Sequence, residues 1–391
     1  IMVESTYGDS HPGSGHLNLL VEEVRKGVAE AGGFGARYFC TDICDGESQG
    51  TDGINYSLAS REMIANMIEI HANATPFDAG VYLSSCDKGV PGNIMGLARV
   101  NIPSVFVPGG TMNAGPEMLT LEQLGMYSAQ YERGEIDEEK LDWAKCNACP
   151  SCGACSFIGT ASTLQIMAEA LGLALPGSAL MPATSPDLLE YAKEAGRQSV
   201  RLAKMKNMKP SDIVTMESFE NAILVHAAIS GSTNCLLHLP AIAHEIGFDF
   251  DIKFANPISE KTPNLCHLAP AGPTYMEDLN EAGGVYAVMK ELADIGLLNT
   301  DCMTVSGKTI GECIATAYNK DEEVIRPVDK PYSKTGGLAV LSGNLAPDGS
   351  VVKRSAVVDE MLVHEGPARV FDCEEDAIAA IKGGKIVPGD V

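Results

Sequence analysis

Basic residues are scarce in this sequence. Its 391 residues include 28 Lys and Arg against 52 Asp and Glu, which gives a formal net charge of −24. Nucleic acids and anionic membrane surfaces are bound through basic patches, so this balance argues against both as partners. An anionic small molecule would need local help from a metal ion or from the N-terminus of a helix.

Long apolar runs are also missing: no stretch reaches the ~18 residues of a transmembrane helix, and no signal peptide is visible. The 12 cysteines are too few for a disulfide scaffold, and four of them crowd into residues 146–155. Such crowding is typical of metal binding in a reducing compartment, so we expect a cytoplasmic protein. Because the chain opens on Ile1 in an apolar run and stops at Val391 after a turn, we interpret it as a fragment.

Short apolar runs alternate with helical patterns through most of the chain, and this alternation predicts an α/β fold with a parallel sheet covered by helices. Residues 1–36 are expected to form a strand, a loop and a helix at 17–31. Further strands are expected at 39–44, 80–84 and 104–107, with helices at 57–73 and 93–100 between them. An acidic, exposed helical insertion is expected at 117–143, and further helices at 187–206, 217–229, 236–246 and 276–298.

The pattern changes near residue 326. Short strands are expected at 338–341, 350–353 and 368–371, followed by a helix at 374–382. This predicts the start of a β-rich, barrel-like C-terminal domain. We therefore divide the chain into an α/β domain, residues 1–325, and an incomplete β-rich domain, residues 326–391.

Cys86, Asp87 and Lys88 follow directly after the expected strand at 80–84. Ligands of open α/β sheets bind at the carboxyl ends of strands. A thiolate suits an iron–sulfur centre and a carboxylate suits Mg²⁺, so the pair suggests two unlike metals close together. The alternative is a buried cysteine beside a surface ion pair. Asp45 is another carboxylate at an expected strand end, where a simple Asp-Gly turn is the alternative.

The run Cys146, Cys149, Cys152 and Cys155 is the strongest local signal, because evenly spaced cysteines are typical of iron–sulfur ligand runs. One segment wraps only part of a cluster, so Cys86 could complete the site. A structural zinc site and four inert thiols are the alternatives. The helix expected after this run would offer its N-terminal N–H groups to a carboxylate or to the cluster.

Two loops rich in small and polar residues carry further candidates. His11 and His16 flank residues 8–16, and we expect helix-cap or core roles for both. Ser232 and Thr233 lie in a break between two expected helices, and this loop either binds substrate or is only a capped interruption.

The ordered set of motifs resembles the dihydroxy-acid and sugar-acid dehydratase family. The motifs are Pro12–Leu17, Ser85–Lys88, Cys149–Cys155 with Gly159–Ser162, and Gly231–Asn234. The stretches Pro331–Asn344 and His364–Val370 are similar to the branched-chain members in particular.

This resemblance implies a hydro-lyase that converts a 2,3-dihydroxy acid to a 2-keto acid in valine and isoleucine biosynthesis, and it implies a homodimer. It implies an iron–sulfur cluster on Cys86 and Cys155, and Mg²⁺ on Asp45, Asp87 and a carboxylated Lys88. Iron with an open site would hold the departing C3 hydroxyl, and Mg²⁺ would stabilise the enolate-like charge. The alternatives are a sugar-acid substrate (an aldonate or 6-phosphogluconate) and, in another class, an iron–sulfur electron-transfer module.

The chain departs from the family pattern in three places. Gly13 stands where many members have a cysteine, which leaves [2Fe–2S] and [4Fe–4S] both open and makes Cys149 or Cys152 candidate extra ligands. The run Glu47–Thr51 is more polar than in the branched-chain enzymes, which puts the substrate in question. The family's last Mg²⁺ ligand, a Glu, and its catalytic Ser are expected beyond Val391.

Overall fold

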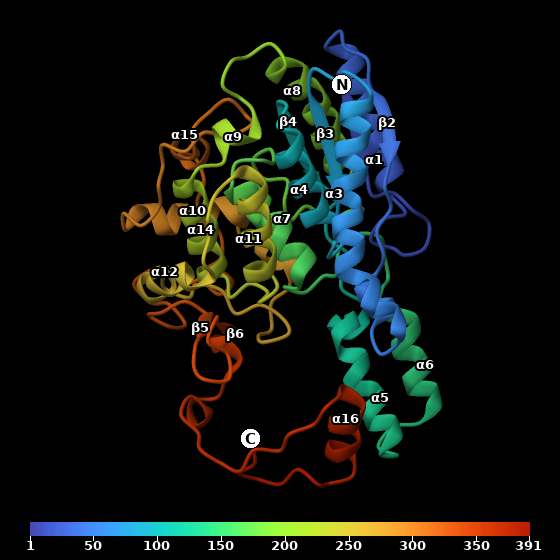
Figure 1. Ribbon diagram of the computed structural model, residues 1–391, viewed down its shortest axis with the longest axis vertical. Helices are drawn as coiled ribbons and strands as arrows, with labels where there is room; N and C mark the ends of the chain where they lie inside the picture. The colour runs from blue at the N-terminus through green and yellow to red at the C-terminus, as the bar shows by residue number, and fades with distance from the viewer. The chain divides into compact units, whose positions relative to one another are not determined.

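A four-stranded parallel sheet forms in the N-terminal part of the chain in a computed structural model that describes residues 1–391 (Figure 1). Its order is β2-β1-β3-β4. Every residue of β1, β3 and β4 is buried, as continuous apolar runs covered on both faces require, whereas β2 alternates as an edge strand. The strands are β1 (Met2–Ser5), β2 (Ala36–Phe39), β3 (Gly80–Ser84) and β4 (Ser104–Pro108).

Helices cover both faces of this sheet. The chain moves in one direction from β1 to β2 and in the other from β2 to β3 and β4. Because strand–helix–strand crossovers are right-handed, α1 lies on one face and α3 and α4 on the other. Helix α8 packs along α1, and α3 packs along α4. These helices are α1 (Leu17–Glu30), α3 (Ser57–Ala74), α4 (Gly89–Val100) and α8 (Pro186–Leu202). The arrangement confirms the predicted α/β class.

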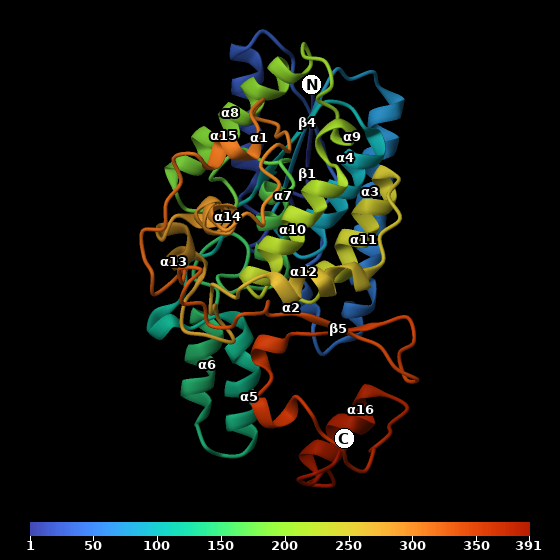
Figure 2. The same cartoon turned by 90° about the vertical axis from the view of Figure 1, so that its left-hand side faces the viewer.

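A second helical layer surrounds α7 (Thr160–Ala170), all of whose residues are buried (Figure 2). Helix α7 contacts α4, α10, α11 and α14. The layer comprises α9 (Pro210–Ile213), α10 (Met216–Ala228), α11 (Cys235–Ile246), α12 (Ala255–Lys261), α13 (Met276–Glu281), α14 (Gly284–Asp294) and α15 (Ile310–Ile314). None of the helices combines the length and apolar character that spanning a membrane requires.

The acidic insertion is helical, as expected. It forms α5 (Leu124–Glu132) and α6 (Glu138–Asn147), which pack on each other around a small apolar cluster that includes Leu119 and Ala144.

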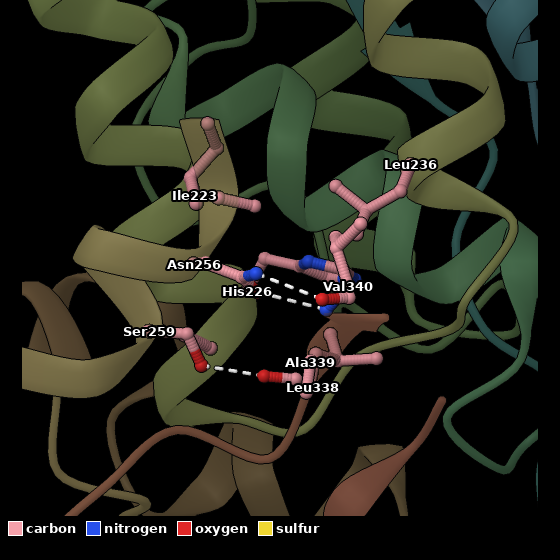
Figure 3. A pocket seen from close by; sticks show the side chains of 10 residues that line it. Ile223, His226, Leu236, Asn256, Ser259, Leu338, Ala339 and Val340 are labelled. Carbon is pink, nitrogen blue, oxygen red and sulfur yellow. Dashed lines mark hydrogen bonds between the residues drawn. The ribbon is translucent and has the colours of Figure 1, made fainter. Parts of the chain in front are cut away.

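Strands β5 (Ala339–Leu341) and β6 (Ser350–Val352) form an antiparallel pair. Side chains of α12 hold the first strand by its backbone (Figure 3). The Asn256 amide donates to the Val340 carbonyl at 2.8 Å and accepts from the Val340 N–H at 2.8 Å. Ser259 donates to the Leu338 carbonyl at 2.7 Å. The larger compact unit therefore runs from Ile1 to Ser355. The division at residue 325 stays a prediction.

The second compact unit is Ala356–Val391 and contains α16 (Glu374–Lys382), as expected. The predicted strand at 368–371 is wrong. Arg369 N–H donates to the Val391 carbonyl, and Val391 N–H donates to the Pro367 carbonyl. The segment therefore pairs with a single residue and has no neighbouring strand.

Candidate metal and substrate site

The carboxyl ends of three neighbouring strands meet at one edge of the sheet. The strand order reverses direction between β1 and β3, and ligands of open α/β sheets bind at such a switch point. The loop after β1 carries His11, the loop after β2 carries Asp42 to Asp45, and the loop after β3 carries Cys86 to Lys88. Segments distant in sequence are thus brought to one place by the topology alone.

Lys88 lies between the two predicted carboxylates. Its Nζ is 2.5 Å from Asp45 Oδ2 and 3.8 Å from Asp87 Oδ2, and its side chain is only 5% exposed. The three residues predicted to hold Mg²⁺ are therefore together. Burial raises the pKa of Asp87, against the lowering effect of the Lys88 ammonium.

Neighbouring elements fix both carboxylates. The Ser57 hydroxyl, at the start of α3, is 2.9 and 2.8 Å from the two Asp45 oxygens. The backbone N–H of Ala161 donates to Asp87 Oδ1 at 3.0 Å. Ala161 lies in the first turn of α7, so the expected contact between this helix N-terminus and a carboxylate is confirmed.

These donors fit a hard cation once Lys88 changes its charge. As an ammonium, Lys88 is itself the cation that neutralises Asp45 and Asp87. Carboxylation of Nζ would replace that positive charge with a third anionic oxygen donor. Mg²⁺ is a hard cation that takes oxygen ligands, and carboxylates are the ones that proteins usually offer it.

A cluster of soft donors lies beside this set. Ligand atoms of His11, Cys44 and Cys86 all lie within 4.8 Å of one another. A hydrogen bond from the Cys86 thiol lowers the pKa of Cys44 to about 7. Cys86 was predicted here, whereas Cys44 was missed. The signal that could have found it is its position directly before Asp45, at the end of the same loop.

His11 is buried, which confirms the expected core placement. Its Nε2 lies 2.9 Å from Asp42 Oδ1, and the Ser14 hydroxyl donates to the same oxygen at 2.5 Å. These contacts correct the expected strand at 39–44, because β2 already ends at Phe39. After β2 the chain turns, and the buried carboxylate of Asp42 is hydrogen-bonded by His11 and Ser14.

Cys155 lines the same cavity as Asp87 and lies within electrostatic reach of Cys44. Burial raises the pKa of its thiol, and the charges of Asp87, Cys149 and Cys44 act in the same direction. Cys149 is exposed and also lies within electrostatic reach of Cys44. Cys152 is only half-buried, and burial of its thiol is what raises its pKa. The roles of Cys149 and Cys152 as extra ligands stay predictions.

A cavity of about 350 Å³ opens onto Asp87 and Cys155. Its polar and ionisable lining residues are Asp87, Cys155, Thr160, Ser162, Ser232, Thr233 and Lys353. The predicted loop is held firmly there: Ser232 N–H donates to Thr163 Oγ1 at 3.1 Å, and the Ser232 carbonyl lies 2.8 Å from His226 Nε2. His226 also lines the small separate pocket where β5 docks (Figure 3).

Lys353 also lines the cavity and was not among the residues predicted from the sequence. It directly follows β6, and burial lowers the pKa of its ammonium. No carboxylate of the protein pairs with it. A cation without a partner beside Thr160 and Ser232 leaves this end of the cavity ready for an anion.

Family models cover nearly the whole chain. The N-terminal model of the dihydroxy-acid/6-phosphogluconate dehydratases matches residues 1–313, and the C-terminal model matches residues 323–391. The chain belongs to this family. The resemblance expected from the four motifs is therefore confirmed.

Individual members of the dehydratase family are similar to this chain over its full length. The dihydroxy-acid dehydratase of Lachnospira eligens is 59% identical over 100% of this chain and 71% of its own length. That of Agathobacter rectalis is 58% identical over 100% of this chain and 70% of its own length. That of Clostridium beijerinckii is 51% identical with the same coverage, 100% and 70%. The stretch compared includes every residue of the cavity and of both donor sets.

Proposed function

We propose that this member of the dehydratase family is a hydro-lyase that converts a 2,3-dihydroxy carboxylic acid to a 2-keto acid. We further propose the branched-chain dihydroxy acids of valine and isoleucine biosynthesis as substrates. One observation carries this: Asp45, Asp87 and Lys88 converge, and Asp87, next to Cys86 in the sequence, lines one cavity together with Cys155. A simple electron carrier has no need for the oxygen donors.

The two donor sets match two cofactors. Asp45, Asp87 and carboxylated Lys88 would hold Mg²⁺, and Cys86 and Cys155 would ligate the iron–sulfur cluster. When bound, these groups would supply Lewis acidity at the departing hydroxyl and at the developing oxyanion.

The protein's own residues bind and orient the acid. The Lys353 ammonium faces the cavity without a protein partner, so it can bind the substrate carboxylate. The hydroxyls of Thr160 and Ser232 lie 3.3 Å apart, close enough to share a substrate hydroxyl between them. The Asn234 amide donates to Thr160 Oγ1 at 2.8 Å and so fixes which lone pairs and protons remain for the ligand. A homodimer and a cytoplasmic location stay predictions.

Turnover by the full-length, anaerobically reconstituted protein tests the proposal. We expect keto acid from 2,3-dihydroxyisovalerate, with a higher kcat/KM than from any of several aldonates or from 6-phosphogluconate. Asp87→Ala should abolish turnover, while an electron carrier would keep a reversible redox signal and be indifferent to the change. Turnover of the sugar acids alone would move the substrate to the other branch of the family, and no turnover of either class would refute the proposal.

A further inference from the structure

The space between Cys44, Cys86 and His11 has the dimensions of a metal pocket. Metal–sulfur and metal–nitrogen bonds in protein sites are about 2.0–2.3 Å long, so ligands on one metal lie at most about twice that far apart. The three ligand atoms here lie within 4.8 Å of one another. Both cysteines are free thiols.

An unpartnered nitrogen borders this space. His11 is 4% exposed, and its Nε2 is bound from behind by Asp42 at 2.9 Å. Its Nδ1 is buried and has no hydrogen-bond partner. A Cβ on Gly13 would lie 2.9 Å from His11 Nδ1 and 3.4 Å from Cys86 Cβ. Any side chain at position 13 would therefore enter the pocket, and glycine keeps it open.

Cys44 connects the two cysteines already assigned to the cluster. Its thiol shares a hydrogen bond with Cys86, and its charge also acts on Cys155. Cys155 is not part of the close group, as expected if a multi-iron centre separates it from Cys86 and Cys44.

We propose that Cys44 is the third thiolate ligand of the iron–sulfur centre, with Cys86 and Cys155. With three thiolates from the protein holding it, the cluster when bound would supply Lewis acidity toward a substrate oxygen. This inference rests on the proposed function, because it requires that the chain binds a cluster.

Thiol protection in the unmutated protein tests the assignment without relying on activity. Iodoacetamide is added anaerobically to the reduced apoprotein and to the iron- and sulfide-loaded protein, and labelling of each cysteine is read by mass spectrometry. We expect Cys44, Cys86 and Cys155 to be labelled in the apoprotein and protected in the loaded form. The exposed Cys146 should be labelled equally in both.

A matched pair of variants provides the second measurement. Cys44→Ser should lose its iron to a chelator at least about tenfold faster than the parent, since even an outer-shell change costs about 10–100-fold in metal affinity. It should also show a changed electron paramagnetic resonance spectrum. Cys40→Ser, four residues earlier on a half-buried thiol, should match the parent in both. Circular dichroism of the apoproteins checks that both variants fold.

The possible failures are distinguishable. Equal labelling of Cys44 with and without the cluster would overturn the inference, as would an unchanged spectrum and iron content in Cys44→Ser. Zinc alone in the purified protein, or no uptake of iron and sulfide by the parent chain, would overturn the proposed function itself.

Discussion

At the scale of single residues, substitution of Lys353 tests most directly whether the cavity binds the carboxylate of the substrate. A hydrogen bond to a charged group contributes about 1.5–3 kcal/mol, so Lys353→Met should raise KM for the dihydroxy acid by at least about tenfold. The effect on kcat should be smaller, because the ammonium binds the carboxylate and does not contact the breaking bond. Lys334→Met, at an exposed lysine of the same region, is the matched control.

The same residue gives this prediction a pH signature. Burial lowers the pKa of Lys353 from its usual value of 10.5, so its positive charge is lost earlier than that of an exposed lysine as pH rises. KM of the parent should therefore increase on the alkaline side, and that increase should be absent in Lys353→Met. Steady-state kinetics across pH measures both. An unchanged KM in the variant at neutral pH would remove Lys353 from the binding site.

Glu4 makes folding stability depend on pH. It is 1% exposed in β1, and burial raises its pKa from 4.5 to about 7 although His71 Nδ1 lies 2.9 Å away. The folded state thus binds this proton more tightly than the unfolded state. Stability from Glu4 is complete below pH 4.5 and falls as pH rises toward 7, by on the order of 3 kcal/mol.

Urea unfolding at pH 5 and pH 8 measures this dependence. The free energy of unfolding should fall between the two pH values in the parent chain, and it should fall less in Glu4→Gln, whose amide does not ionise. Glu322→Gln, on the surface, should behave as the parent does. An equal fall in Glu4→Gln and in the parent would assign the pH dependence to other groups.

At the scale of elements, two glycines allow α1 and α8 to pack closely. A Cβ on Gly27 would lie 1.8 Å from the Lys193 carbonyl oxygen, and one on Gly196 would lie 2.1 Å from the Val24 carbonyl oxygen. Both obstacles are backbone atoms, so the helices must move apart to accept a methyl group. Gly27→Ala should therefore destabilise the protein by about 1–3 kcal/mol despite the better helix propensity of alanine.

A glycine in an open position supplies the control for that substitution. Nothing lies within 4 Å of a Cβ built on Gly125 in α5. Gly125→Ala should be neutral or stabilise by up to about 1 kcal/mol. The two variants are compared by denaturant unfolding, and equal stabilities would show that the α1–α8 contact can relax at little cost.

Sequence periodicity predicted the elements whose side chains are buried locally. The runs at 80–84 and 104–107 match β3 and β4 closely, because all their residues face covered surfaces. Periodicity gave wrong predictions where a residue's hydrogen-bond partner is distant in the sequence. Asp42 was placed in a strand, but its partner His11 lies in the loop after β1. Residues 368–371 were given a strand because apolar alternation does not reveal whether a neighbouring strand is present.

Some residues of the site could likewise be predicted from the sequence, and others could not. Asp45, Asp87 and Lys88 could be named because they match positions in the motifs of the family that the chain resembles, although β2 ends at Phe39 and not next to Asp45. Lys353 could not, because its importance depends on the cavity that the fold forms around it. Cys44 directly precedes Asp45 but was missed, because Cys86 and His11, which lie close to it, come from distant segments.

At the scale of the whole molecule, the net charge of −24 sets the background for any metal effect. Like charges on an acidic chain repel in the folded state, and added salt screens them. Any salt should therefore raise the melting temperature of this protein. A specific Mg²⁺ site would raise the melting temperature further than this general effect of salt. The comparison therefore needs NaCl and MgCl₂ at equal ionic strength.

In the parent chain we expect MgCl₂ to raise the melting temperature more than NaCl does, when bicarbonate is present to carboxylate Lys88. A ligand at about 100 times its Kd stabilises the folded state by about 2.7 kcal/mol, which differential scanning calorimetry resolves as several degrees. Asp45→Asn and Asp87→Asn should each keep the response to NaCl and lose the extra response to MgCl₂. Asp142→Asn, whose side chain is 62% exposed in α6, should keep both. If MgCl₂ and NaCl act equally on the parent chain, the convergence of Asp45, Asp87 and Lys88 is only an ion-paired lysine, and the hard half of the proposed site does not exist.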